Sequence, residues 1–402
     1  MLTISGHGGT GGAIKRSPDD FVVKEITSKG HVLEPGKVYD ARSLDEEEVP
    51  AGKQITFVLE KRDWNTSNAV LAIAKRMGRG RKSMGYAGTK DKFALSVQLA
   101  SVFHPEPFDM SSIRMKDISI NGSWRSDGVR LGTNLGNAFD VVIRSATSPN
   151  AADAIAEELG GTMPNYFGSQ RFGERQNNAK IGTMIMRNEL EEAALEFLTG
   201  TTNERNEDIV AARRRLRDEG DYKEALSYFP KFLKGERSVI AYLAENKGRY
   251  ANAFRMLPRG LLLMLIHAVQ DQVFNDELDQ RIRERNFKSP AYAQRDFYGF
   301  PDVDHPGKSG DFPLSCMVGY ETKEEDISDY TRDLMERAGI RKEDFKLKSI
   351  PELSTRGSYR ALLAPVKNLS HSVEENGTDV RLRFELPGGS YATVLLNEFV
   401  KS

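Results

Sequence analysis

The strand-like segments of this 402-residue chain lie near its two ends, and a helical, highly charged region separates them. Residues 20–26, 54–63, 94–102 and 136–146 are rich in Val, Ile, Phe and Leu, as strands are. Residues 380–387 alternate apolar and polar side chains, which predicts a strand with one buried face. We expect residues 391–400 to pair with it across a glycine turn. The pattern predicts a sheet-based domain interrupted by an insertion, not two domains in series.

Several segments have the apolar spacing and the end signals of helices. Residues 66–77 can begin at Thr66 or Ser67, which are good N-cap residues, and end at Gly78. Residues 150–161 predict a short helix that ends in two glycines. The strongest helices of the middle region are predicted at 212–229 and 258–285, the second started by Pro258. We therefore predict a sheet domain formed by residues 1–185 and 351–402, and a helix-rich insertion formed by residues 186–350.

Composition excludes several classes of protein. A single cysteine, Cys316, cannot form an intramolecular disulfide, and six scattered histidines offer no cluster with metal-ligand spacing, so no metal site is expected. The longest apolar stretch, residues 260–269, is well short of the roughly 18 residues that a membrane span needs. The N-terminus lacks a signal-peptide pattern. We expect a soluble, cytoplasmic protein, and the net charge of −1 neither indicates nor excludes a nucleic-acid partner.

A turn in the first strand-rich region carries an unusual arrangement of charges. Asp91 lies between Lys90 and Lys92, and small residues precede it, including Ala87 and Gly88. A solvated surface turn explains the charges as well as a catalytic carboxylate does. The turn alone therefore leaves both interpretations open.

The glycine-rich residues 6–12 are a second candidate for a functional loop. They fit neither a phosphate-binding loop nor a dinucleotide fingerprint, because no strand precedes them and no helix follows. We expect a flexible terminus there.

Basic side chains gather after the helix predicted at 66–77. They can contact RNA phosphates without reading sequence, although a solvated helix end is an equally good interpretation. The residues are Lys75, Arg76, Arg79, Arg81 and Lys82.

Residues 164–173 combine amides, an arginine and three aromatic side chains. Such a mixture can hydrogen-bond the edge of an unpaired base and stack on its face. The alternative is a loop whose aromatic side chains simply enter the core. Tyr391, just past the glycines at 388 and 389, poses the same choice between a pocket and the core.

Seven segments, taken in chain order, resemble the tRNA pseudouridine synthase D (TruD) family. They are residues 14–26, 59–78, 86–98, 131–144, 164–173, 265–278 and 384–398, so the resemblance runs nearly from end to end. It implies an α+β fold in which a pseudouridine synthase catalytic domain, with a mixed and mostly antiparallel sheet, is interrupted by a helix-rich insertion called the TRUD domain. The charged start of the insertion, near residues 205–217, lies outside these seven segments, so the resemblance does not indicate what it contacts.

The resemblance also implies roles for individual residues. Asp91 matches the catalytic aspartate of the family. The matching active-site support residues are Lys15, Phe21, Asn165, Phe167 and Tyr391, and many members have phenylalanine at the last position. The predicted RNA contacts are the five basic residues at 75–82 together with Lys90, Lys92 and Arg171.

The implied reaction converts uridine to pseudouridine in tRNA, and the uridine that the resemblance implies is uridine 13 of the D arm. It consumes no oxidant or water, so no cofactor is expected, and tRNA is the only partner expected: no membrane and no obligate protein partner. Three alternatives remain open: a pseudouridine synthase for another RNA, an inactive RNA-binding protein of the same fold, and a hydrolase built on one carboxylate. The last would usually need a second acid, which the lysines beside Asp91 do not supply.

Overall fold

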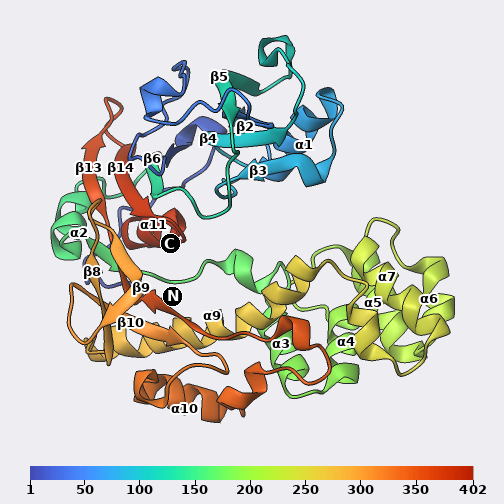
Figure 1. The fold of residues 1–402 in the computed structure, drawn as a ribbon. Helices are drawn as coiled ribbons and strands as arrows, with labels where there is room; N and C mark the ends of the chain where they lie inside the picture. The colour runs from blue at the N-terminus through green and yellow to red at the C-terminus, as the bar shows by residue number, and fades with distance from the viewer. Residues whose placement is uncertain (402) are drawn as a thin grey trace. The chain divides into compact units, whose positions relative to one another are not determined.

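The computed structural model describes residues 1–401, which form two compact units (Figure 1). The sheet unit comprises Thr3–Pro164, Asp296–Phe300 and the chain from Leu363 onward. The helical unit comprises Met1–Leu2, Asn165–Arg295 and Pro301–Leu362. The chain therefore leaves the sheet unit, builds most of the helical unit, and returns to complete the sheet.

An eight-stranded sheet forms the body of the sheet unit. Its strand order is β13-β14-β6-β1-β4-β2-β5, and β3 also pairs with β4. Among the strands of residues 1–401, β1 and β4 are the one pair that runs parallel, so the structure confirms the α+β class and the mixed, mostly antiparallel sheet. The strands are β1 (Phe21–Ile26), β2 (Gln54–Arg62), β3 (Met84–Tyr86), β4 (Leu95–Phe103), β5 (Ile118–Ser126), β6 (Gly136–Ile143), β13 (Lys367–Val373) and β14 (Val380–Pro387).

Apolar side chains cover both faces of this sheet. Helix α1 (Thr66–Arg76) packs Val70 and Ile73 against Phe57 on one face. Residues from the loop between β1 and β2, including Leu44, pack against Val58 and other residues on the opposite face. The N-cap of α1 is Asn65, whose side chain accepts the Asn68 N–H, and not Thr66 or Ser67 as predicted. Thr66 is buried and serves another purpose, described below.

The last segment of the chain corrects the predicted strand at 391–400. Residues 392–400 form helix α11 (Ala392–Val400), which packs against α2 (Ala151–Leu159) and β7 (Thr162–Pro164). Both edges of β14 are already paired, one with β6 and one with β13, so no edge is free for another strand. Ala392, Leu395, Leu396 and Phe399 are buried at helical spacing, which a helix can satisfy without an edge.

The glycine-rich N-terminal segment is also not the flexible terminus that we expected. Thr10 is fully buried, and its N–H donates to the Phe399 carbonyl at 2.6 Å. A Cβ at Gly9 would lie 2.5 Å from the Val400 carbonyl oxygen, so only glycine allows this close approach to the end of α11. The segment thus closes the sheet unit by packing on its last helix.

The helical unit is organised around one long helix, α9 (Arg259–Glu284), which follows Pro258 as predicted. Figure 1 shows α9 running from the group of helices α3–α8 to a small sheet of order β11-β10-β8-β9. The other helices and strands of the helical unit are α3 (Asn178–Met186), α4 (Leu190–Thr199), α5 (Glu207–Glu219), α6 (Tyr222–Tyr228), α7 (Lys234–Glu245), α8 (Tyr250–Phe254), α10 (Asp329–Arg337), β8 (Ala291–Arg295), β9 (Pro301–Gly307), β10 (Phe312–Met317) and β11 (Ser358–Ala361). Strand β12 (Leu363–Pro365) returns the chain to the sheet unit, where it pairs with β7.

Two features of the helical unit differ from the sequence pattern. The helix predicted at 212–229 is divided into α5 and α6, because Gly220 takes a left-handed conformation (φ 66°) and Asp221 caps a new helix. The compact unit also extends beyond the predicted insertion of 186–350 on both sides. Helix α3 packs on α9 so closely that a Cβ at Gly182 would lie 2.1 Å from the Leu265 carbonyl oxygen, which ties residues 165–185 to this unit.

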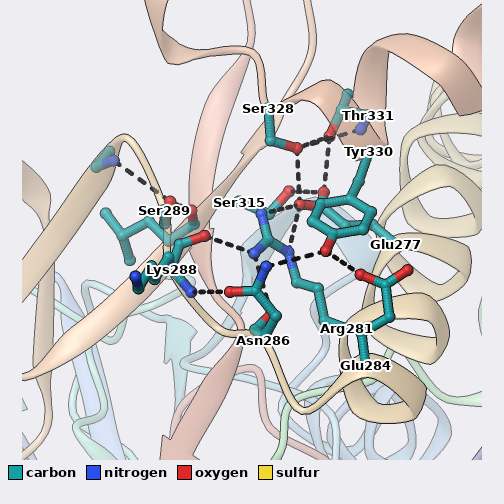
Figure 2. A network of polar contacts seen from close by, with 12 residues as sticks. Glu277, Arg281, Glu284, Asn286, Lys288, Ser289, Ser315, Ser328, Tyr330 and Thr331 are labelled. Carbon is teal, nitrogen blue, oxygen red and sulfur yellow. Dashed lines mark hydrogen bonds and ion pairs between the residues drawn. The ribbon is translucent and has the colours of Figure 1, made fainter.

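A buried ion pair joins the elements around the C-terminal half of α9 (Figure 2). Glu277 and Arg281 are fully buried and lie one helical turn from each other, with Glu277 Oε1 2.7 Å from Arg281 Nη2. The Glu277 carboxylate also accepts hydrogen bonds from Ser315 on β10 and from Thr331 on α10. The Arg281 guanidinium donates to the Lys288 carbonyl, beyond the end of α9. The pair therefore fixes β10 and α10 against α9.

Candidate functional site

The Asp91 carboxylate lies in the loop between β3 and β4 and faces a lysine from a distant part of the sequence. The Lys15 Nζ lies 3.0 Å from Asp91 Oδ2, and both side chains are partly exposed. The same ammonium lies 4.1 Å from the centre of the Phe21 ring, a cation–π distance. The structure thus brings together three residues that the sequence analysis singled out: Lys15, Phe21 and Asp91.

The backbone around Lys15 is held in a conformation that few side chains adopt. Lys15 has a φ of 58°, in the left-handed region that is uncommon for residues other than glycine. Two residues further on, the Ser17 N–H donates to the Asp20 carboxylate, and Asp20 in turn pairs with Arg144 at 2.6 Å. Phe21 then enters β1 fully buried. This framework, and not the local preference of Lys15, aims its ammonium at Asp91.

Three polar side chains lie under the Asp91 loop, and we call Glu25, Lys61 and Gln98 the polar floor. They come from β1, β2 and β4, and strand alternation places them on the sheet face that also carries α1. Each contacts the loop: Gln98 Nε2 donates to the Gly88 carbonyl at 3.0 Å, and Lys61 Nζ donates to the Asp91 carbonyl at 2.9 Å. The Glu25 carboxylate lies 2.8 Å from the Lys90 ammonium.

Thr66 completes the support of this loop from the start of α1. Its hydroxyl accepts the Lys90 N–H at 2.9 Å and donates to Gln98 Oε1 at 2.9 Å. The backbone on both sides of Asp91 is therefore fixed by buried side chains, which restricts where its carboxylate can point.

Lys90 is one of the predicted RNA contacts, and its position in the structure contradicts that prediction. Its side chain is 3% exposed and paired with Glu25, which is 1% exposed, so its ammonium is not presented to a phosphate. The ion pair lies inside the protein because the loop turns Lys90 toward the sheet and Lys92 away from it. Lys92 is exposed, as the prediction requires.

Lys61 is the most unusual charged group of the polar floor. It is fully buried, and burial lowers its pKa from the ordinary value of 10.5 to about 8. The neighbouring Asp91 acts in the opposite direction, whereas the positive charge of Lys90 lowers the pKa further. Sequence reasoning missed Lys61, Glu25, Thr66 and Gln98. The one available signal was a polar residue within an otherwise apolar strand.

Asn165 and Phe167 belong to the helical unit and are buried. The Asn165 Nδ2 donates to the Ala361 carbonyl, and the Arg360 guanidinium donates to Asn165 Oδ1 at 2.8 Å. The Arg360 guanidinium also lies 3.9 Å from the centre of the Phe167 ring. The aromatic residues of 164–173, which include Tyr166, are buried, so this loop follows the alternative in which its aromatic side chains enter the core.

Arg171 is partly buried beside an acidic residue that the sequence analysis did not select. Its Nε lies 3.4 Å from Asp271 Oδ2, and its guanidinium lies 5.3 Å from the Phe167 ring centre. Burial raises the pKa of Asp271 to about 6, which the positive charges of Arg171 and Arg360 oppose. Arg171 is therefore engaged within the protein, and about a third of its side chain remains exposed.

The remaining predicted residues lie at the surface of the sheet unit. Lys75, Arg76, Arg81 and Lys82 are exposed at and after the end of α1, whereas Arg79 pairs with Glu106. Tyr391 is half-buried and directly precedes α11. Within residues 1–401, no hydrogen bond, ion pair or ring contact links its side chain to Asp91 or Lys15.

Residues 1–401 contain neither a cluster of metal-binding side chains nor a membrane-spanning helix. No group of three or more His, Cys, Asp or Glu side chains is arranged to hold a metal ion. No helix is both long enough and apolar enough to cross a lipid bilayer.

Known proteins resemble this chain over almost its whole length. A family model described as tRNA pseudouridine synthase D (TruD) matches residues 2–297 and 303–399. A curated protein of Methanopyrus kandleri, named "Probable tRNA pseudouridine synthase D", is 36% identical over 87% of this chain and 86% of its own length. A counterpart from Methanocaldococcus jannaschii, named "Probable tRNA pseudouridine synthase D 1", is 32% identical over 98% of this chain and 96% of its own length.

The fold leads to the same group of proteins. A crystal structure from Methanosarcina mazei, described as a "Putative tRNA pseudouridine synthase D (TruD)", superposes with a TM-score of 0.77 at 28% identity, covering 100% of this chain and 96% of the other. Together, these matches define an RNA pseudouridine synthase, an enzyme of the isomerase class. The chain belongs to the tRNA pseudouridine synthase D family.

Proposed function

We propose that this protein isomerises uridine to pseudouridine in tRNA, at uridine 13 of the D arm, with Asp91 as the catalytic carboxylate. The observation that carries the proposal is the Lys15–Asp91 ion pair, because Asp91 is both partly exposed and fixed in place by the polar floor. A carboxylate that is accessible to substrate and rigidly supported suits chemistry at a sugar carbon. The names of the relatives support tRNA as the substrate.

The reaction detaches the base, turns it and attaches it again. The bond between N1 of uracil and C1′ of the ribose breaks, and a bond between C5 and C1′ forms. N1 gains a proton and C5 loses one, so the product is an isomer of the substrate. In this proposal the Asp91 carboxylate stabilises positive charge at C1′ or adds to the reacting nucleoside. Lys15 orients that carboxylate and balances its charge.

The target base has to leave its stack before Asp91 can reach the nucleoside, which costs a few kcal/mol. We assign Tyr391 to contact with the flipped uracil, because an aromatic ring can stack on a base. Asn165 and Phe167 keep the role of support residues. The exposed basic residues, Lys75, Arg76, Arg81, Lys82 and Lys92, are proposed to contact phosphates.

The proposal extends to the domains and to the place of action. The sheet unit is proposed as the catalytic domain and the helical unit as the TRUD insertion, with the cytoplasm as the compartment. No cofactor enters the proposed reaction, because its atoms and electrons balance without one.

The test measures tritium release from tRNA transcripts labelled at C5 of uridine, with wild type and Asp91→Asn. Release by wild type alone, lost when uridine 13 of the transcript is replaced by cytidine, is the expected result. Release by both proteins would remove Asp91 from the reaction. Release that survives the cytidine replacement would contradict the assignment of uridine 13, and no release from any tRNA would contradict tRNA as the substrate.

A further inference from the structure

Lys61 is a fully buried lysine on β2 whose ammonium touches the loop that carries Asp91. Its Nζ donates to the Asp91 backbone carbonyl at 2.9 Å, the hydrogen bond that the structure records for this ammonium within residues 1–401. The buried lysine of the Asp91 loop, Lys90, has a carboxylate partner in Glu25 of the polar floor. Within residues 1–401, Lys61 therefore contributes a positive charge that is not neutralised by a carboxylate in direct contact.

A buried ammonium in this position is costly if its only task is to hold a sheet together. Taking a charge out of water is unfavourable, and an apolar side chain of similar length would fill the same space without that cost. The neighbouring strand residues on this face, Phe57 and Leu59, are apolar and fully buried. The polar exception lies where the strand passes under Asp91, which indicates a purpose connected with that residue.

We propose that Lys61 is a positioning residue for Asp91, holding its backbone from below while Lys15 holds its carboxylate from the side. The Asp91 carbonyl and carboxylate are then each fixed by a separate lysine, at 2.9 Å and 3.0 Å. This inference rests on the proposed function, since it assigns Lys61 to the same reaction. It adds that the reaction depends on a group that does not touch the substrate.

The charge of Lys61 makes this dependence measurable through pH. Because the pKa of Lys61 is lowered to about 8, its ammonium loses a proton at a pH at which an ordinary lysine would still be charged. The charged groups that act on it are Asp91 and Asp63, which raise its pKa, and Lys90, which lowers it. Above that pH the neutral amine pulls less strongly on the Asp91 carbonyl, so activity should decline.

The experiment compares wild type with Lys61→Met and Lys61→Arg in the tritium-release assay from pH 6 to pH 10. We expect Lys61→Met to lower kcat by about 10- to 100-fold, the effect of a small misplacement of a catalytic group, with KM for tRNA nearly unchanged. The decline of wild-type activity above pH 8 should be absent in Lys61→Met. In Lys61→Arg the decline should also be absent up to pH 10, because guanidinium stays charged throughout this range.

A matched control is Lys24→Met, which removes a lysine from β1 on the opposite face of the sheet, where it pairs with Glu34. Its kcat and pH profile should equal those of wild type. The inference is overturned if Lys61→Met keeps wild-type kcat or if its KM for tRNA rises by as large a factor as its kcat falls. It is also overturned if the alkaline decline persists in the variants. If Lys61→Met does not fold, the presence or absence of the decline in Lys61→Arg decides alone. A wild type without activity on any tRNA would instead contradict the proposed function.

Discussion

The side-chain amide of Asn275 binds both backbone polar groups of Phe167. Asn275 Oδ1 accepts the Phe167 N–H at 2.9 Å, and its Nδ2 donates to the Phe167 carbonyl at 3.0 Å. Asn275 lies on α9 and Phe167 in the irregular segment after β7, so one amide replaces the strand partner that Phe167 lacks. The contact links the segment 165–172 to the main helix of its unit.

Asn275→Ala should therefore destabilise the protein substantially. It leaves a buried N–H and a buried carbonyl without partners, and each such group costs about 1–3 kcal/mol. Asn275→Asp, which keeps an acceptor but loses the donor, should also lose stability. Gln272→Ala is the control, because it removes an exposed amide from the same helix and should change the free energy of unfolding by less than about 0.5 kcal/mol. Urea unfolding of the full chain measures all three, and equal effects for Asn275→Ala and Gln272→Ala would disprove the role of the contact.

Lys15→Met tests whether the ion pair serves the reaction or the binding of RNA. If Lys15 orients Asp91, kcat should fall by about 100-fold, while the Kd for tRNA should change by less than about threefold. Arg16→Met removes the next positive charge along the chain, which is exposed, and should leave kcat unchanged. Single-turnover rates and filter-binding affinities separate the two effects. Losses of the same size in rate and in binding would show that Lys15 acts as an RNA contact.

Replacing one residue of the buried Glu277–Arg281 pair should lower the free energy of unfolding more than replacing both. Arg281→Met strands a buried carboxylate and should cost about 3–5 kcal/mol of unfolding free energy. Replacing both residues, as Glu277→Gln with Arg281→Met, should recover part of that loss. The exposed pair of Asp333 and Arg337 on α10 has the same helical spacing, and Arg337→Met should cost less than about 1 kcal/mol. A double variant less stable than Arg281→Met would contradict this account.

The sequence predicts the architecture well where a local side-chain pattern determines it. The alternation in β14 and the apolar spacing in α9 follow directly from side-chain patterns, and the return of strands at the end of the chain indicates the interruption of the sheet domain. The strand predicted at residues 391–400 is wrong, because the apolar residues of this segment fit a helix as well as a strand. The deciding fact is that β14 is already paired on both edges, and this depends on β6, more than 200 residues earlier in the chain.

The site is predictable in its reacting group but not in its support. Asp91 and Lys15 stand out through the family motifs. Lys61 and Gln98, by contrast, are single polar residues within strands, and they are buried only because the loop at 88–91 folds back over them. The same long-range contact explains why Lys90 was expected at the surface but lies inside, next to Glu25. Periodicity cannot reveal which loop covers a given face of a sheet.

Acid should weaken the junction between β6 and β14 through Asp379. Its carboxylate accepts the Ser145 N–H at 2.9 Å and lies 2.6 Å from an Arg144 nitrogen, and these contacts lower its pKa to about 2. A carboxyl whose pKa is depressed on folding stabilises the protein at every pH above its ordinary value of 3.8. That stabilisation is lost as the pH falls toward 2.

Asp379→Asn should accordingly be less stable than wild type at neutral pH, and the difference should shrink with acidification. The neutral amide keeps the shape of the side chain but binds Arg144 and the Ser145 N–H more weakly. We expect a constant difference in the free energy of unfolding between pH 7 and pH 5, and a smaller one at each step from pH 4 toward pH 2. Denaturant unfolding across this range measures it. A difference that stays the same from pH 7 down to pH 2 would show that folding does not depress the pKa of Asp379 and that its pairing with Arg144 contributes little.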